Sequence, residues 1–385
     1  MKIAIIGGGT SGVITALRMF ENGHKVDIYV DPNKSALNVG ESTTPVIGAT
    51  IMRNLKLSIQ DMVAMGIASI KTGVKFVDWG IGNSFIHGFK NEMAFHFESV
   101  PFSETLSSNL KQIGITYIYE NVPGHKENEH SITINDRDYD FVVYCTGWST
   151  EDSYSSPMFS SVNSAILFQE DSLDKDQTCT LHNATDDGWM FGLPFPERGI
   201  TKRGYLYDKD LPLSSGLEKR LANNDYARQI SWTPRVSDVL IQSKRVAYNG
   251  NRLFFIEPLQ ALSLHFYDYF AVQMCQYLFD FSDRSRGFAN KQYNITITEY
   301  QLSIAYHYSF GSTKETKFWK DIQEKATNLL NLVSPYGKRK LFQNLIETDE
   351  QYRSERLHLS GMGSFEYDDL NWLHQGFTGK KLFTD

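Results

Sequence analysis

The sequence contains little cysteine and no excess of positive charge. Its three cysteines, Cys145, Cys179 and Cys275, have neither CxxC spacing nor an even number, so the pattern indicates neither a disulfide framework nor a zinc site. The formal net charge of −7 argues against a nucleic-acid-binding surface, because such surfaces gather Lys and Arg against phosphates. We expect a protein of a reducing compartment, with no bound metal and no nucleic-acid partner.

Long apolar runs are also absent. No stretch approaches the roughly 20 residues that a membrane-spanning helix needs, and the N-terminus enters a strand at once instead of presenting a secretory leader. These features predict a cytoplasmic protein without a membrane partner. In contrast, 41% hydrophobic and 13% aromatic residues in a chain of 385 are enough to bury a large core in one or two domains.

The N-terminal residues predict a βαβ unit. The stretch MKIAIIGGGTSGVITALRMFENGHKVDIYVD is typical of a strand over about 2–6, a Gly-rich turn, a helix to about Asn22, and a second strand that ends near Val30. This order of elements is the setting in which a Gly-rich turn holds a nucleotide.

Three glycines in that turn match the GxGxxG spacing of dinucleotide-binding proteins. Gly7 allows the tight turn, Gly9 lets the backbone approach a pyrophosphate, and Gly12 lets the helix pack on the strand. The amides and the dipole of the helix N-terminus both favour an anion there. Asp31, at the end of the second strand, can accept hydrogen bonds from ribose hydroxyls. We therefore predict a bound dinucleotide, in preference to a Gly-rich turn that serves packing alone.

A second fingerprint is not found. GIGNSF at 80–85 and GMGSFE at 361–366 lack the third glycine and the strand-to-helix setting. A single fingerprint suits one tightly associated dinucleotide, most simply FAD, which receives its electrons from elsewhere.

The domains are expected to be interleaved, because no linker and no internal repeat divides the chain. We predict an FAD-binding α/β domain over 1–285, with substrate-side segments at about 76–130 and 165–245 inserted between its strands. Residues 286–385 have mostly helical spacing and are expected to cover the active site.

Two further stretches fit this plan. YDFVVYCTGWS (139–149) predicts a buried strand that ends in a Cys-Thr-Gly turn, which would bring Gly147 near a cofactor. Residues 250–281 predict a strand, a turn at Pro258 and a long amphipathic helix.

Five short motifs follow one another in the first 195 residues. They are GGGTSG (7–12), VGESTTP (39–45), IKTGVKFVDW (70–79), SFIHGF (84–89) and GWMFGLPF (188–195). As a set they resemble the flavin-dependent halogenases of the tryptophan-halogenase type, in a short version such as phages encode, and the likeness runs through most of the first 280 residues. The resemblance implies a Rossmann-like FAD domain of the aromatic-hydroxylase kind, an interleaved substrate-side sheet and a helical C-terminal region.

The resemblance also implies which residues hold the cofactor. The first motif resembles the family's FAD fingerprint, and VGESTTP resembles its flavin strap, a loop that touches both the cofactor and the active site. The cofactor-binding positions implied are Gly7, Gly9, Thr10, Ser11, Gly12, Asp31, Gly40, Glu41, Ser42, Thr43, Gly147, Asn251 and Leu264.

The family's catalytic lysine falls on Lys71, within a strand that is otherwise apolar. By resemblance, the strand lines a passage between flavin and substrate, and His87 and Phe89 lie beside the substrate ring. GWMFGLPF is a loosened form of the family's Trp-x-Trp-x-Ile-Pro signature, which implies that Trp189 and Phe191 keep the substrate away from the flavin. The alternatives are a lysine whose amine reaches the surface, a satisfied half-buried histidine, and aromatic residues that serve the core alone.

The sequence departs from the family at EPLQALSLH. The family's indole-acting members carry a Glu near the lysine, and here that position is Gln260, which cannot act as a base. Glu257 lies one helical turn earlier and would share a face with Gln260 if a helix has begun there. The halide-binding amides implied belong to Leu262 and Ser263, and a serine in place of the family's glycine puts the halide geometry in question.

An aromatic cluster near the C-terminus allows two interpretations. Phe365, Tyr367 and Trp372 could form a lid over a substrate pocket, with Phe365 touching the substrate, or they could pack along one face of a helix.

The function implied is that of an FAD-dependent halogenase, an oxidoreductase. It uses reduced FAD, oxygen and a chloride, bromide or iodide ion to make hypohalous acid, which halogenates an electron-rich aromatic ring through Lys71. The partners implied are a small aromatic substrate and a separate NAD(P)H-dependent flavin reductase, and homo-oligomerisation stays open. The alternatives are a flavin-dependent aromatic hydroxylase, which halide dependence would distinguish, and a non-catalytic flavoprotein, which the Gln260 position motivates.

Overall fold

The computed structural model describes residues 1–34, 41–90, 92–147, 149, 153–172, 174, 176–213, 227–332 and 367–381. The chain divides into two compact units, each assembled from three separate segments. Unit 1 comprises residues 1–57, 97–156 and 235–295, and unit 2 comprises residues 58–96, 157–234 and 296–385.

The two units alternate along the chain, and the predicted domain bounds stay a prediction. Residues 97–130, predicted to belong to a substrate-side segment, lie in unit 1. The physical reason is strand pairing, because β7 (Thr116–Ile118) adds to the edge of the unit 1 sheet by pairing with β2 (Lys25–Tyr29). Of the C-terminal helices, α7 (Asp283–Tyr308) is divided between the units at residues 295 and 296, whereas α8 (Lys317–Leu332) and α10 (Tyr367–Thr378) belong to unit 2.

Unit 1 is built on a parallel sheet of five strands. The order is β19-β11-β1-β2-β7, with β1 at Lys2–Ile6, β11 at Phe141–Tyr144 and β19 at Val246–Tyr248. All four residues of β11 are buried, as is typical of a central strand that is covered on both faces. Strands β1 and β2 pair in parallel, and helix α1 lies between them in the chain. The predicted βαβ unit is therefore confirmed.

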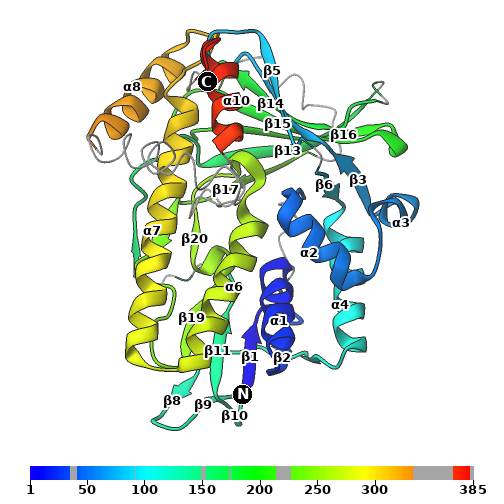
Figure 1. The fold of residues 1–385 in the computed structure, drawn as a ribbon, viewed down its shortest axis with the longest axis vertical. Coiled ribbons are helices and arrows are strands. Elements are labelled where there is room, and N and C mark those ends of the chain that lie inside the picture. Colours follow the sequence, from blue (N-terminus) through cyan, green and yellow to red (C-terminus); the bar gives the residue numbers. More distant parts are fainter. Residues whose placement is uncertain are drawn as a thin grey trace. The chain divides into compact units, whose positions relative to one another are not determined.

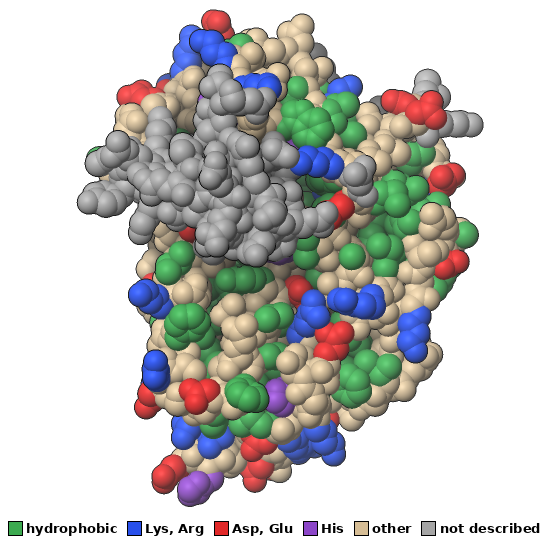
Figure 2. Space-filling view, in the orientation of Figure 1, with side chains coloured by type: hydrophobic (Ala, Val, Ile, Leu, Met, Phe, Trp, Pro, Cys, Tyr) green, Lys and Arg blue, Asp and Glu red, His purple; other side chains and the backbone are tan. Residues whose placement is uncertain are grey.

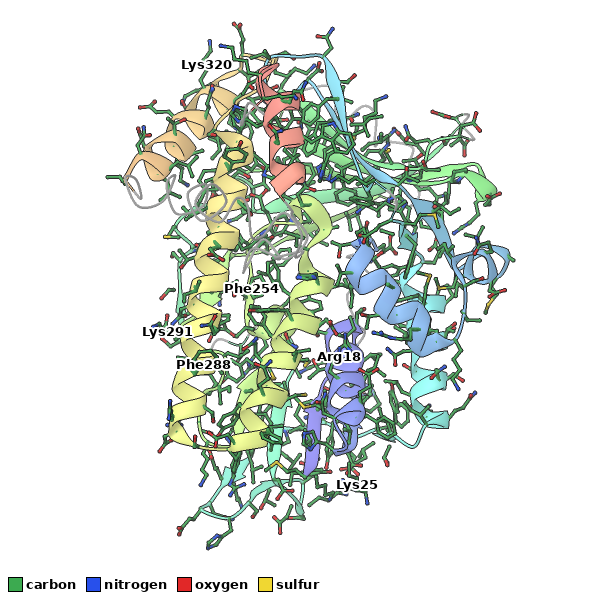
Figure 3. All side chains as sticks on the ribbon, viewed as in Figure 1. Arg18, Lys25, Phe254, Phe288, Lys291 and Lys320 are labelled. Atoms are coloured by element: carbon green, nitrogen blue, oxygen red, sulfur yellow. The ribbon has the colours of Figure 1, made fainter. Side chains whose placement is uncertain are left out.

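Four helices that lie wholly within the described part of unit 1 accompany this sheet. They are α1 (Thr10–Glu21), α2 (Pro45–Leu55), α4 (Ser99–Gln112) and α6 (Ser263–Asp280). Helices α1 and α6 run side by side (Figure 1). Arg18 of α1, labelled in Figure 3, forms an ion pair with Asp268 of α6 and donates a hydrogen bond to Thr50 of α2 at 3.3 Å. One guanidinium thus ties three helices together.

Two small antiparallel sheets complete unit 1. One has the order β10-β9-β8 and the other β12-β18-β20. Their bounds are β8 Lys126–Glu127, β9 Ile132–Ile134, β10 Arg137–Tyr139, β12 Tyr154–Ser155, β18 Arg235–Ser237 and β20 Phe254–Phe255, with short 3-10 turns at Gly250–Arg252 and Leu259–Ala261.

Unit 2 is built on a seven-stranded sheet with the order β17-β13-β16-β15-β14-β4-β5. All its pairings are antiparallel except that of β14 with β4, which is parallel. The bounds are β4 Gly73–Val77, β5 Ser84–Gly88, β13 Ser164–Asp171, β14 Cys179–Thr185, β15 Gly188–Phe195, β16 Ile200–Tyr207 and β17 Arg228–Ser231, with a short 3-10 turn at Pro196–Arg198.

A two-stranded sheet carries the lysine strand. It pairs β3 (Ala68–Lys71) with β6 (Ala94–Phe97). Helix α3 (Ile59–Ala64) packs beside β3.

The helical character predicted for the C-terminal region is observed. Helix α7 (Asp283–Tyr308) is followed by α8 (Lys317–Leu332) and α10 (Tyr367–Thr378), and α10 packs against β5. None of the described helices combines the length and apolar character needed to cross a bilayer. On the face shown in Figure 2, basic and acidic side chains are interspersed.

Candidate active site

The Gly-rich turn of unit 1 has the backbone that its spacing predicts. Gly7 has a φ of +117°, and a Cβ added there would lie 2.7 Å from the carbonyl oxygen of Cys145. A Cβ on Gly12 would collide with the carbonyl oxygen of Gly7, whereas one on Gly9 would meet nothing within 4 Å. Packing thus requires glycine at positions 7 and 12, whereas Gly9 faces open space where a pyrophosphate can approach.

The N-terminus of α1 is ready to receive an anion. Its N-cap residue is Gly9, and no side chain caps the helix, so the first amides of Thr10 and Ser11 are not used by a capping group. Gly147, in the turn after β11, has a φ of +80°, and a Cβ there would also meet nothing within 4 Å. This glycine-lined opening fits the phosphates and backbone contacts of a dinucleotide.

Other predicted cofactor residues have clear local partners. One carboxylate oxygen of Asp31 accepts the amide of Asn33 at 2.9 Å, which leaves the second oxygen 3.7 Å from Lys34 Nζ. Asn251 accepts a hydrogen bond from the hydroxyl of Tyr267 at 3.0 Å. Leu264 is buried in the first turn of α6.

Asn249 is a structural residue that sequence reasoning missed. It is fully buried, and its Nδ2 donates to Thr15 Oγ1 at 2.9 Å and to the carbonyl of Tyr267 at 2.8 Å. Its Oδ1 accepts the amide of Gly250 at 2.8 Å. Ser11 packs against Gly250, where an added Cβ would lie 2.6 Å from the Cβ of Ser11, and the φ of +64° at Gly250 is itself strained for a residue with a side chain. The side chain of Asn249 therefore fixes α1, α6 and the Gly250 turn to one another.

The described part of the strap begins at Glu41, and Gly40 lies outside the described residues. Glu41 Oε1 accepts hydrogen bonds from the amide and the hydroxyl of Ser99, at 3.2 and 2.8 Å, at the first residue of α4. Ser42 and Thr43 are buried. Thr44 precedes α2, and its Oγ1 is buried without a hydrogen-bond partner in the structure. A buried hydroxyl of this kind is suited to a hydrogen bond with a ligand or a water molecule.

The segment around Gln260 differs from the predicted helix. The helix has not begun at Glu257, because α6 begins at Ser263, so Glu257 and Gln260 do not share a helical face. Gln260 and Ala261 have left-handed backbones, with φ values of +66° and +56°, which are costly for residues other than glycine.

Ser263 adopts an ordinary helical backbone instead, and it is the first residue of α6. The positive φ values thus lie two and three residues before Ser263, and the halide geometry stays a prediction. No side chain caps α6 at Leu262, so the amides that begin this helix are suited to an anion. Glu257 and Gln260 are both buried.

Lys71 lies at the end of β3 in unit 2 and is 1% exposed. The surface interpretation of this lysine is therefore wrong. Its Nζ lies 5.4 Å from the centroid of the Phe89 ring. Burial lowers the pKa of Lys71 to about 7, an effect that Cys179 partly offsets. The amine and ammonium forms thus coexist near neutral pH.

Phe89 lies beside Lys71 and His87 packs against Phe89, while their contact with a substrate ring stays a prediction. The two rings pack edge to face at 6.3 Å, and the amide of Phe89 donates to the carbonyl of Thr72 at 2.9 Å. His87 is 3% exposed on β5, where it pairs with Val74 of β4. The structure therefore places Phe89, and through it His87, next to the buried amine of Lys71.

Trp189 and Phe191 lie on β15 of the same unit. Trp189 is fully buried and packs 4.8 Å from the His182 ring. Phe191 is half-buried and lies over the backbone of Gly204, where a Cβ would strike its ring. Both rings have packing partners in the sheet, and their role as a wall stays a prediction.

Three buried histidines in unit 2 were not predicted. They are His96, His182 and His307, each at most 2% exposed. Burial, followed by the charge of Lys71, lowers the pKa of His96 and of His182 well below the ordinary range, and burial lowers the pKa of His307 to about 4. The alternating pattern of TLHNAT contained a signal, because His182 lies on the buried face of that strand.

The predicted lid is only partly described. Phe365 lies outside the described residues, as does the side chain of Tyr367. Trp372 is 43% exposed, whereas Leu373 and Phe377 of the same helix are fully buried. Across the described ranges, no group of three or more His, Cys, Asp or Glu side chains could hold a metal ion.

Comparison with known proteins agrees with this geometry. The family model described as tryptophan halogenase matches residues 2–93 and 90–355. The chain belongs to the tryptophan halogenase family. As a member of this family it is an FAD-dependent halogenase, an oxidoreductase that uses reduced FAD and a halide ion. None of the curated proteins compared matches the chain.

Solved halogenase structures share its fold. The tryptophan halogenase of Shewanella frigidimarina has a TM-score of 0.78 at 18% identity, over 98% of this chain and 88% of the other. The tryptophan 6-halogenase of Streptomyces toxytricini has a TM-score of 0.77 at 18% identity, over 98% and 90%. The flavin-dependent halogenase BrvH of Brevundimonas sp. BAL3 has a TM-score of 0.75 at 18% identity, over 98% and 89%.

The residues present fit the family's cofactor. The open space beside Gly9 and Gly147 and the uncapped N-terminus of α1 suit a dinucleotide, and the orphaned hydroxyl of Thr44 marks a further polar contact point on the strap. These features favour binding of FAD at the N-terminal Gly-rich fingerprint of this chain.

Proposed function

We propose that Lys71 is the catalytic residue through which this halogenase delivers the halogen to a small, electron-rich aromatic ring. When bound, reduced FAD supplies hypohalous acid together with oxygen and a halide. The observation that supports a catalytic role for Lys71 is its complete burial beside the Phe89 ring. Lysine side chains are rarely fully buried in proteins, so a buried lysine indicates a specific role.

The chemistry available to Lys71 follows from its protonation. With a pKa lowered to about 7 by burial, part of the population at neutral pH is an amine, which can take up the halogen and release water to form a haloamine. The ammonium form can instead donate a hydrogen bond to hypohalous acid and polarise it. Both routes need the amine beside the substrate ring, which is where His87 and Phe89 are proposed to contact the substrate.

The halide site is proposed at the N-terminus of α6. The amides of Leu262 and Ser263 lie at the beginning of an 18-residue helix that no side chain caps, and a helix N-terminus favours an anion. This proposal needs only backbone groups, so it tolerates the side chains that differ from the family pattern.

The substrate preference is proposed to be broad. Gln260 replaces the family's carboxylate and cannot take the proton from the ring after halogen addition, nor pair as an anion with an indole N–H. We expect strongly electron-rich rings to react better than free tryptophan. Glu257 is the nearby carboxylate in the sequence, and Glu257→Gln tests whether it takes over that role.

The decisive experiment is a screen of indoles, phenols and anilines with chloride, bromide and iodide. Reduced FAD is supplied by a separate flavin reductase, and halogenated product is measured by mass spectrometry. We expect product with the parent protein and none with Lys71→Ala, while oxidation of reduced FAD continues in both. Hydroxylated product without any halide requirement would replace this proposal with an aromatic hydroxylase.

Lys71→Arg separates the two routes for the halogen. Arginine keeps the positive charge and the hydrogen-bond donors but does not readily form a haloamine. Activity retained in Lys71→Arg would favour hydrogen bonding, and activity lost would favour the covalent carrier.

A further inference from the structure

A buried hydrogen-bond network lies next to the lysine strand and joins four strands of unit 2. His96 of β6 contacts Thr180 of β14 through Nε2 at 2.8 Å, and Ser69 of β3 through Nδ1 at 3.3 Å. The hydroxyl of Ser69 donates to the carbonyl of Pro194 on β15 at 2.5 Å. The three side chains are at most 2% exposed, so water does not compete for these bonds.

The number of protons in the network selects one arrangement. Ser69 has one hydroxyl proton, which it gives to Pro194, so its oxygen accepts from His96 Nδ1–H. His96 is neutral, because burial and the neighbouring charge of Lys71 lower its pKa well below the ordinary range. Its Nε2 therefore accepts the hydroxyl of Thr180. Every donor and acceptor of the histidine is used, as a buried polar network requires.

The network ends on the strand that carries Lys71. Ser69 and Lys71 are two residues apart on β3 and project to the same side of the strand. On the other side of the lysine, the amide of Thr72 donates to the carbonyl of Thr178 at 3.1 Å, and the two threonine hydroxyls lie 2.8 Å apart. The backbone around Lys71 is thus held on one side by the network of Ser69, His96 and Pro194, and on the other by Thr178, the residue before β14.

We propose that His96, as the neutral Nδ1–H tautomer, is a positioning residue for halogenation that locks the Lys71 strand onto β14 and β15. The inference rests on the proposed function of Lys71 and names a residue that acts through it. Sub-ångström placement matters for such a group, because a misplacement of about 1 Å can cost on the order of 100-fold in rate. Pro194 belongs to the strand of Trp189 and Phe191, so the same network sets the lysine against the proposed wall.

The test compares His96→Phe and His96→Asn with the parent protein. The readout is halogenated product formed per reduced FAD oxidised, compared at equal concentrations of folded protein so that a general loss of stability does not change it. We expect His96→Phe to lower this ratio by at least about tenfold at an unchanged rate of flavin oxidation. His96→Asn keeps an N–H donor near the Nδ1 position and should recover part of the loss.

Two controls separate the possible outcomes. His374→Phe removes another histidine of unit 2, which hydrogen-bonds to Tyr306 at 2.8 Å, and should leave the ratio unchanged. If His96→Phe does not fold, Ser69→Ala removes one link of the network and should lower the ratio in the same direction.

A parent-like ratio in the folded His96→Phe or Ser69→Ala protein, with Lys71→Ala inactive, would overturn the role of His96 and leave that of Lys71 intact. An equal loss in His96→Phe and His96→Asn, accompanied by slower flavin oxidation, would indicate a purely structural histidine. If Lys71→Ala is as active as the parent, both proposals fail.

Discussion

Replacing Lys71 by methionine should make the protein more stable as it becomes inactive. The folded protein holds this lysine in a water-excluded position that lowers its pKa from the ordinary 10.5 to about 7, whereas the unfolded chain leaves it in water. Between about pH 7 and pH 10.5, the unfolded state therefore binds a proton at Lys71 more readily than the folded state does. Methionine keeps much of the length and volume of the side chain and removes the charge that burial penalises.

The magnitude follows from the same two pKa values. Each pKa unit corresponds to about 1.4 kcal/mol, so the drop from 10.5 to about 7 gives an upper bound of about 4 to 5 kcal/mol. Replacements of buried charges by apolar groups commonly gain about 1 to 4 kcal/mol. The destabilising contribution of Lys71 is fully present below about pH 7 and disappears as the pH rises towards 10.5. The advantage of Lys71→Met should shrink accordingly.

The assay is thermal or urea unfolding of both proteins between pH 6 and 9.5. A matched control is Lys320→Met on α8, because Lys320 is exposed (Figure 3) and its replacement removes no buried charge. An advantage of Lys71→Met that is absent at pH 6, or that stays constant up to pH 9.5, would refute the reasoning. It would mean that the folded protein pairs the ammonium well enough to offset its burial.

Four further outcomes are expected. In the parent protein, halogenated product per reduced FAD oxidised should rise with pH through about 7, following the amine form of Lys71, and a fall would indicate that the ammonium is the active form. Asn249→Ala should destabilise the fold by about 2 to 4 kcal/mol in urea unfolding, because it leaves buried partners of three hydrogen bonds unsatisfied, whereas an effect below about 0.5 kcal/mol would show that water replaces them. NADPH alone should not bleach the bound flavin, since the described fold has a single fingerprint, and bleaching without a reductase would contradict this. Bromide and iodide should outperform chloride, with tryptophan a poor substrate, and efficient single-position chlorination of tryptophan would argue against a relaxed site at Gln260.

The N-terminal fold could be predicted because local and long-range signals agree there. Gly7 and Gly12 are required both by the turn and by close packing, so spacing alone identifies the βαβ unit. The apolar stretch that became β11 is buried on both faces, which the sequence shows as a continuous hydrophobic run.

The site was predictable only where a residue type conflicts with its surroundings. Lys71 stands out in an apolar strand, whereas the histidines that accompany it give a weaker signal, because the alternation of TLHNAT assigns His182 to one face of its strand without showing that this face is buried. Their positions depend on pairing between distant strands, as with His182, which lies opposite Phe76 of β4. The left-handed backbone of Gln260 was missed for a related reason, since glycine is the usual signal for positive φ.

The parallel pairing of β4 with β14 has a consequence for how the protein is made. About a hundred residues separate the two strands in the chain, so at about 5 to 20 residues per second a ribosome delivers β14 some 5 to 20 seconds after β4. During that interval the β4–β5 hairpin can form, yet one edge of β4 has no neighbour and is open to pairing with other nascent chains. Lys75 lies in the middle of β4, and its charge is of the kind that discourages such pairing. The protein should therefore need Lys75, and the help of chaperones, more during synthesis than after folding.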